Sequence, residues 1–142
     1  MSDFSITSTT LDNPVDTRWR ASHHGQFTAQ PGTLDLTTFV AGTHYNIGAR
    51  TDFVIPSGVA VQYNETSKMY EPWDPAAGTV APIAGYINDN QGVSVKRADG
   101  TTATKGAFAR LLHGILDAQY LPVAAQKAAV KTAETTAQIS FI

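Results

Sequence analysis

The apolar positions of the chain are arranged most regularly in residues 53–87, where they predict three short strands. Residues 59–63 alternate between large apolar side chains and small or polar ones, which is the period of a strand with one buried face. A turn then leads to residues 69–73, and Pro72 favours a sheet-edge position for that run, because proline cannot donate to a ladder. Residues 80–87 are almost continuously apolar, which is typical of a strand buried on both faces. We therefore expect this stretch to form the centre of the domain.

Two more strands are expected after this stretch. Residues 93–97 alternate between apolar or long side chains and polar ones, and a polar turn precedes them. Residues 107–116 carry apolar side chains at spacings that fit a helix as well as a strand. Gly106 and Gly114 would each cost about 1 kcal/mol relative to alanine inside a helix. We therefore predict a strand over residues 107–116.

The sequence contains one strongly helix-forming segment, residues 123–136, which follows Pro122. Proline suits the first helical position because its missing N–H would be unpaired there in any case. The apolar stripe of this helix is narrow and includes Val123, Ala124, Ala128 and Val130, so close packing against another surface is expected. Residues 139–142 are apolar at alternate positions and predict a strand in the sheet or a subunit contact. The expected fold class is α+β, a small β-rich mixed domain with one C-terminal helix and an extended N-terminal arm.

Residues 1–50 show no sustained period of 2 or 3.6 and are rich in threonine, serine, glycine and proline. We expect an extended arm over residues 1–32 and a domain over residues 33–142. The arm contains more large apolar side chains than a solvated tail would have, so these side chains pack on their own domain or on a partner. A partner is favoured before Gln30, because a terminus is more often loosely held. For residues 34–45 both alternatives stay open.

Trp19 is the most prominent candidate anchor in the arm, because arginines flank it on both sides. In an extended chain Arg18 and Arg20 share the face opposite the indole. They could meet carboxylates of a partner while Trp19 fills an apolar pocket. Residues 6–10 are β-branched enough to lie along an exposed strand edge of that partner. The candidate partner-binding residues of the arm are Phe4, Ile6, Arg18, Trp19, Arg20 and Phe27.

The composition excludes several classes of function. Charged residues make up 15% of the chain, the formal net charge is -2, and lysine and arginine form no cluster. Such a surface gives no electrostatic footprint for nucleic acid. There is no cysteine, so stability depends on packing or association. The first residues do not resemble a secretion signal, and no apolar run approaches the ~20 residues of a membrane span. We expect synthesis and assembly in the cytoplasm, with no membrane partner.

No motif has the spacing that catalysis or cofactor binding requires. Residues 100–106 resemble a phosphate loop, but their lysine precedes the second glycine instead of following it. His23 and His24 are adjacent and would point to opposite faces of a strand. His44 and His113 have no cysteine or carboxylate at ligand spacing. We therefore expect no enzyme activity, no cofactor and no metal, and structural or exposed histidines are favoured over a metal site.

Six segments together carry a resemblance to a known family. They are TLDLTTFVAGTHY (33–45), FVIPSGVAV (53–61), YEPWD (70–74), APIAGYI (81–87), LLHGILDAQYLP (111–122) and AQISFI (137–142). In this order and spacing they resemble the head decoration, or capsid cement, proteins of tailed bacteriophages, the family of the phage lambda decoration protein. The resemblance covers residues 33–142. It does not extend to the arm, and residues 93–105 are variable within it.

The resemblance implies a mixed α/β domain that forms a homotrimer at three-fold positions on the outside of the phage head. There it would bind the major capsid protein and stabilise the capsid against internal DNA pressure. The protein would be made in the host cytoplasm and become part of the virion. The alternative is a trimeric tail-tip or receptor-binding module, which would also be β-rich and free of cysteine. The expected trimer or capsid contacts are Tyr70, Trp73, Ile139, Phe141 and Ile142.

Overall fold

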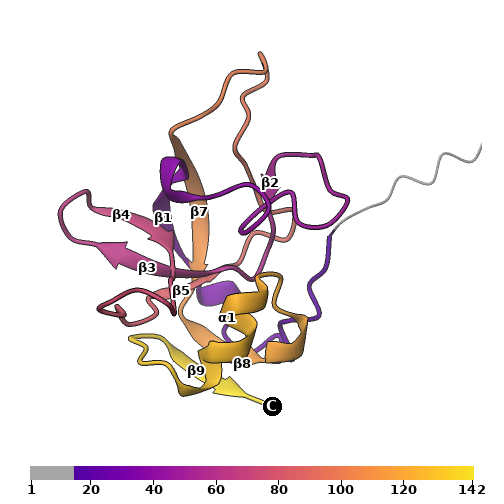
Figure 1. The fold of residues 1–142 in the computed structure, drawn as a ribbon. Helices are drawn as coiled ribbons and strands as arrows, with labels where there is room; N and C mark the ends of the chain where they lie inside the picture. The colour runs from indigo at the N-terminus through magenta and orange to yellow at the C-terminus, as the bar shows by residue number, and fades with distance from the viewer. Residues whose placement is uncertain (1–14) are drawn as a thin grey trace, which may run out of the picture.

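A closed barrel of five strands forms the larger part of the structure, a computed structural model that describes residues 15–142 (Figure 1). The strands follow one another around the barrel in the order β1, β4, β3, β5 and β7. Neighbouring strands are antiparallel except for β1 and β4, which run parallel. The strands are β1 (Gln30–Asp35), β3 (Ala60–Asn64), β4 (Met69–Pro72), β5 (Gly85–Ile87) and β7 (Lys105–Leu111).

Two small sheets complete the strand content of the described residues. β2 (Val54–Ile55) pairs antiparallel with β6 (Val93–Ser94). β8 (His113–Leu116) pairs in parallel with β9 (Gln138–Phe141), below the barrel in Figure 1. Residues 19–21 run along the other side of β8, where the Ala21 N–H donates to the Ile115 carbonyl at 3.0 Å. β8 therefore lies between an early and a late segment of the chain.

The helical segments are short. α1 (Ala124–Ala129) continues into the 3-10 turn η4 (Val130–Thr132). The other 3-10 turns are η1 (Gln26–Thr28), η2 (Leu36–Thr38) and η3 (Ala118–Tyr120). The helix expected over residues 123–136 is confirmed in position but is shorter than expected. It ends because residues 134–136 pair with the Ile83 backbone, whose N–H donates to the Glu134 carbonyl at 2.8 Å.

The side chains that α1 buries differ in part from those expected. Val123 and Val130 of the expected stripe are buried, whereas Ala124 and Ala128 are exposed and Gln126 is buried in addition. Pro122 lies just before the N-cap residue Val123 and not at the first helical position. The helix therefore packs through larger side chains than the alanine stripe suggested.

Two apolar clusters lie on opposite sides of the barrel wall. Successive residues at the start of β3 point alternately into one cluster and the other. Val59 and Val61 point into the first cluster, and Ala60 between them points into the second. The alternation expected for residues 59–63 is thus confirmed for residues 59–61, whereas Tyr63 is 42% exposed. Ala60, expected to meet solvent, is buried beside Trp19 and bonded to Gln126 of α1. The first cluster contains Leu34, Leu36, Phe39, Ile55, Val59, Val61, Ile87, Val93, Val95, Phe108 and Val123. The second contains Trp19, Ala60, Trp73, Ile83, Tyr86, Leu111, Leu116, Ala118, Leu121 and Val130.

Several strand predictions need correction. β4 lies between β1 and β3 and not at an edge, and Pro72 is tolerated there as the last residue of the strand. The strand expected over residues 80–87 is limited to β5. Pro82 cannot donate to a ladder, and the backbone of Ile83 pairs with residues 134–136 instead. Of residues 80–87 only residues 83–87 are buried, and Val80 is 44% exposed.

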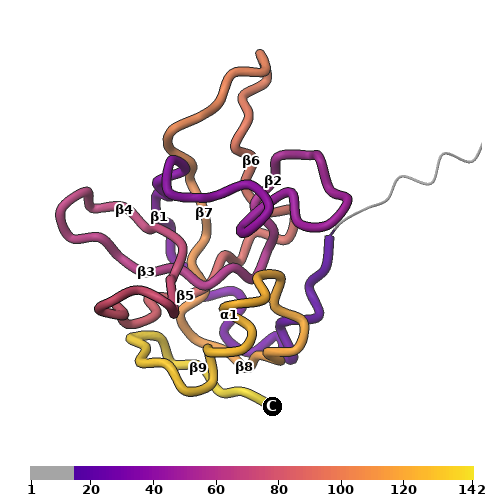
Figure 2. Tube along the Cα trace, viewed as in Figure 1, coloured from indigo at the N-terminus to yellow at the C-terminus, as the bar shows by residue number. Residues whose placement is uncertain are grey.

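The later strands also differ in extent from the prediction. The strand expected over residues 93–97 is reduced to β6, after which the chain forms a projecting hairpin closed by a bridge between Lys96 and Thr102 (Figure 2). Residues 107–116 are extended, as expected, but they form two strands separated at Leu112. The break allows β7 to pair within the barrel while β8 pairs outside it.

The chain before residue 33 does not form a separate arm in its described part. β1 begins at Gln30, so the boundary expected between residues 32 and 33 falls inside a barrel strand. Residues 19–21 pair with β8, as described above. Residues 1–14 lie outside the described residues.

One buried side chain, Gln126, joins α1 to the barrel. Its Oε1 accepts the Ala60 N–H at 2.8 Å, and its Nε2 donates to the Ala60 carbonyl at 2.9 Å and to the Trp73 carbonyl at 2.8 Å. The amide thus uses both of its donor hydrogens and its acceptor oxygen. It bridges Ala60 at the start of β3 to Trp73, the residue after β4, whose N–H also donates to the Ala60 carbonyl at 2.9 Å.

Replacing Gln126 by alanine should destabilise the protein by about 3 kcal/mol, because the Ala60 N–H and the Trp73 carbonyl lose a buried partner. Urea unfolding followed by tryptophan fluorescence measures this change. Lys127→Ala, at the next and exposed position of the same helix, is the matched control and should leave the midpoint nearly unchanged. Equal midpoints for the two variants would contradict the bridging role of Gln126.

Ile83→Asp should abolish folding, because Ile83 is 1% exposed in the second cluster and a carboxylate there has no partner. Thr79→Asp, in the exposed loop four residues earlier, should be tolerated. Circular dichroism melting of both variants is the measurement. A cooperative transition in the Ile83→Asp protein would contradict the assigned core.

Candidate docking surface

Phe27 is the most exposed large apolar side chain among the described residues, at 86% of its full accessibility. It lies in η1, where the Thr28 hydroxyl and the Thr28 N–H both bond the Gly25 carbonyl. The Asn88 side-chain amide donates to the Gln26 carbonyl at 3.1 Å and ties the turn to the residue after β5. The ring is therefore held in solvent by an ordered turn. Phe27 was predicted as a partner-binding residue, and its position leaves it available for that role.

Trp19, the anchor favoured from the sequence, belongs to the protein's own core. Its side chain is fully buried, its Nε1 donates to the Ser57 hydroxyl at 3.0 Å, and its ring stacks on Tyr86 with 6.2 Å between centroids. Gly58 has a φ of +96°, a backbone conformation that L side chains rarely adopt, and a Cβ there would lie 2.9 Å from the indole. The prediction that Trp19 fills a pocket on a partner is wrong for this structure, because the pocket is formed by residues 57–58 and their neighbours.

Arg18 and Arg20 also differ from their predicted arrangement. Arg18 is exposed and pairs with Asp16 at 2.8 Å, and its hydrogen bond lowers the pKa of the Asp16 carboxyl. Arg20 is partly buried and donates to the Asn88 carbonyl at 2.9 Å, and desolvation lowers the pKa of its guanidinium. The two arginines therefore do not form one face for partner carboxylates. Arg18 is the more exposed of the two.

The two remaining arm candidates, Phe4 and Ile6, lie outside the described residues. The segment expected to pair along a partner's strand edge, residues 6–10, lies there too. Their proposed role in docking stays a prediction.

The aromatic residues of β4 and the following turn are largely internal. Trp73 is 2% exposed, and its Nε1 donates to the Ala81 carbonyl at 2.8 Å. Tyr70 is half-buried, with its ring centroid 5.4 Å from Phe108 and 5.0 Å from Tyr63. Trp73 was expected to contact another subunit or the capsid. This expectation needs correction, because its indole is buried in the second cluster. Tyr63, on the neighbouring strand, is the exposed member of this group.

The strand expected at residues 139–142 is confirmed as β9, with bounds one residue earlier. Ile139 and Phe141 are half-buried against the second cluster, whereas Ile142 is 67% exposed. Within residues 15–142, β9 pairs with β8 on one side and has no strand on the other. This outer edge and Ile142 give the surface backbone groups and an apolar side chain that a second chain could contact.

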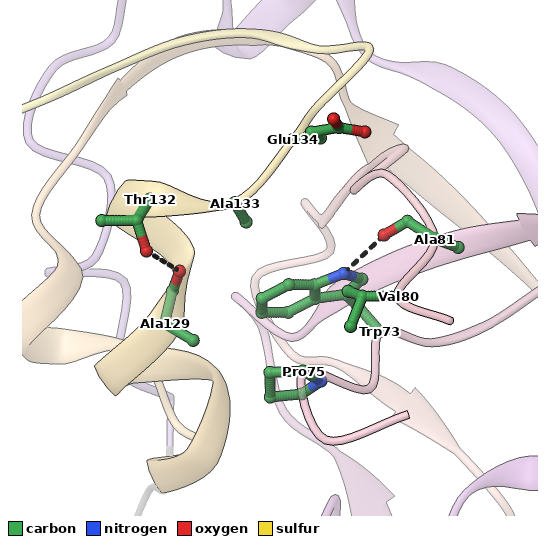
Figure 3. Close-up of a pocket in the computed structure, with 8 residues that line it drawn as sticks. All are labelled: Trp73, Pro75, Val80, Ala81, Ala129, Thr132, Ala133 and Glu134. Atoms are coloured by element: carbon green, nitrogen blue, oxygen red, sulfur yellow. Dashed lines mark hydrogen bonds between the residues drawn. The ribbon is translucent and has the colours of Figure 1, made fainter. Parts of the chain in front are cut away.

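A groove separates α1 and η4 from the loop that follows β4 (Figure 3). It has a volume of about 390 Å³, with Ala129, Thr132 and Ala133 on one side and Trp73, Pro75, Val80 and Ala81 across from them. Glu134 is the one ionisable residue of its lining. The Thr132 hydroxyl on the other wall donates to the Ala129 carbonyl at 3.4 Å.

Sequence reasoning missed two exposed apolar residues, Val40 and Val80. Val40 lies in the loop between η2 and β2, and Val80 in the loop before β5. Neither belongs to an alternating or helical pattern that would have singled it out. Their exposure depends on the path of the loops, which local sequence does not determine.

Metal-binding clusters and membrane-spanning helices are two further features that the described residues allow to be assessed. Across residues 15–142 no three histidine, cysteine or carboxylate side chains gather closely enough to hold a metal ion together. No helix in the same range is long and apolar enough to cross a membrane. Comparison of the chain with family models, with curated proteins and with solved structures finds no match.

Trp19→Ala should lower the free energy of unfolding by about 3–5 kcal/mol, as removal of a fully buried large aromatic side chain does. Urea denaturation of the purified chain measures the change. Arg18→Ala, at the adjacent exposed position, should leave the midpoint nearly unchanged. If Trp19→Ala unfolded at the wild-type midpoint, the indole would have to be outside the core and the anchor hypothesis would stand again.

Proposed function

We propose that the chain is a structural virion protein of a tailed bacteriophage. In this role it binds the outer surface of the head as a trimer at three-fold positions and stabilises the capsid against internal DNA pressure. The proposal starts from the resemblance of residues 33–142 to head decoration proteins. The small β-rich α+β domain is of the class which that resemblance implies.

Phe27 is the structural observation that supports docking most directly. Contact of the exposed Phe27 ring with water is unfavourable, and binding of the ring in an apolar pocket would remove that contact. Burial of such a side chain contributes about 1.5–3 kcal/mol. The turn is already ordered, so little conformational entropy is lost when the ring docks. Phe27 can therefore serve as the anchor that Trp19 does not provide.

The outer edge of β9 supports the proposed trimer. A strand edge with unpaired backbone groups and an adjacent exposed Ile142 is the kind of surface that another subunit covers. Ile139 and Phe141 fix the position of this edge, because their side chains pack on the second cluster. Three linked chains then increase apparent affinity for the capsid by ~10²–10⁴ without any new contact.

Phe27 and the β9 edge lie at the same end of the molecule. The turn that carries Phe27 contacts β8 at His113, and β8 pairs with β9. In a trimer formed through β9, the turn that carries Phe27 would thus lie on the same layer of each subunit as the contact. Such a role involves the major capsid protein as partner and requires neither catalysis nor a cofactor.

Electron microscopy tests this function. Heads that lack the protein are incubated with the purified full chain, imaged and compared with untreated heads. Regular knobs at three-fold positions are the expected result. Density at the tail tip with a bare head would overturn the proposal and favour the receptor-binding alternative.

Phe27→Ser should strongly reduce head occupancy and leave the melting temperature unchanged, because the ring contacts solvent and not the core. Phe27→Tyr keeps the aromatic ring and should retain most of the occupancy. Occupancy and melting are measured on the same samples. Full occupancy with Phe27→Ser would remove this residue from the docking surface.

Deletion of residues 2–14 tests the rest of the arm without removing Trp19 or any part of β1. We expect weakened head binding and an unchanged melting temperature. A lowered melting temperature with full occupancy would show that these residues stabilise their own domain instead.

A further inference from the structure

Two histidines that are far apart in sequence meet at the end of the small β8–β9 sheet. The Nε2 atoms of His24 and His113 are 2.6 Å apart, and their rings are tilted by 53° with centroids 4.6 Å apart. Two imidazole nitrogens at this distance need a shared proton or a shared cation between them, since two facing lone pairs repel. The rings therefore meet through the two atoms that commonly bind metals.

The fold brings these rings together through close backbone approach. Gly25 has a φ of +78°, and a Cβ on it would lie 2.1 Å from the His113 carbonyl oxygen. A Cβ on Gly114, from the other side, would meet the His24 carbonyl oxygen. The Ser22 hydroxyl also accepts the His24 N–H and shapes the turn. The position of His24 over β8 thus results from glycines on both segments.

Gln138 orients the His113 ring. His113 and Gln138 are register partners on β8 and β9, and the Gln138 Oε1 lies 3.1 Å from the His113 Nδ1. When Nδ1 donates to this oxygen, the proton is on Nδ1 and the Nε2 lone pair faces His24. An outer hydrogen bond of this kind is what usually fixes a metal-binding imidazole.

We propose that His24 and His113 bind a divalent transition metal ion through their Nε2 atoms, with Zn²⁺ as the preferred ion. Water would complete the coordination. Imidazole nitrogens suit Zn²⁺, whereas Mg²⁺ and Ca²⁺ prefer oxygen ligands. In a tetrahedral complex the two nitrogens lie about 3.3 Å apart, given Zn–N bonds of about 2.0–2.1 Å. His24 is exposed, so a small rotation of its side chain achieves this separation.

The site would link the turn that carries Phe27 to the β8–β9 sheet. Residues 24–28 are attached to the rest of the chain by few bonds, among them the one from Asn88 to Gln26. A metal bridge to His113 adds a second attachment on the opposite side of the turn. The proposal is independent of the head-binding function, because it concerns the isolated chain.

Calorimetric and thermal titrations of the untagged full chain test the site. Zn²⁺ should bind with one ion per chain and raise the melting temperature to a plateau, because the ion binds the folded state. Mg²⁺ and Ca²⁺ should do neither. Absence of Zn²⁺ binding up to about 1 mM would show that the rings share only a proton and would overturn the proposal. An equal shift with Mg²⁺ would overturn it as well.

Variants assign the ligands. His24→Gln and His113→Gln should each weaken Zn²⁺ binding at least about tenfold, and Gln138→Leu about tenfold through loss of ring orientation. His23→Gln is the matched control, since its Nδ1 faces Gln26 at 3.0 Å and not the pair, and it should bind as the wild type does. In nitrogen-detected spectra of the imidazoles, Zn²⁺ should shift the Nε2 signals of His24 and His113. Wild-type affinity in either His24→Gln or His113→Gln would contradict the assignment.

Discussion

The three hydrogen bonds of the buried Gln126 amide connect the two parts of the structure. Ala60 lies where the barrel wall faces the second cluster, and β4 has already ended opposite it. Without a partner the Ala60 N–H would be unpaired in an apolar environment, which is costly. Gln126 supplies that partner and at the same time holds α1 against the wall. The position of the helix in turn covers Trp73 and closes the second cluster.

The sequence predicted those parts of the fold whose side chains follow a local period. The alternation of residues 59–63, the helix after Pro122 and the strand near residue 140 all lie close to where they were expected. Barrel closure was not predictable, because the parallel pairing of β1 with β4 depends on a contact between distant segments. The strand expected over residues 80–87 was predicted too long for a similar reason, since Ile83 pairs with residues 134–136 and only β5 joins the barrel.

The candidate docking surface likewise depends on contacts between distant segments, which local sequence does not predict. A tryptophan between two arginines has the same local pattern whether its pocket lies on a partner or on its own domain. Ser57 and Gly58 form part of the Trp19 pocket on the chain's own domain, and nothing in the residues around Trp19 predicts this contact. Phe27 was identified correctly as a large side chain in a polar segment, but its exposure follows from the turn at Gly25. The meeting of His24 with His113 likewise depends on two glycines 89 residues apart in sequence, and local spacing gave no reason to bring these two histidines together.

The placement of β8 between residues 19–21 and β9 has a consequence for the order of synthesis. β8 pairs with a segment that leaves the ribosome early and with one that leaves it more than a hundred residues later. This layer therefore cannot be completed during elongation, and its long-range contacts make it a slow step of folding. In a nascent chain the β9 edge would be absent until synthesis had passed residue 141. Premature self-association through this edge on the polysome is thereby disfavoured, because the edge forms after the segments that it packs against.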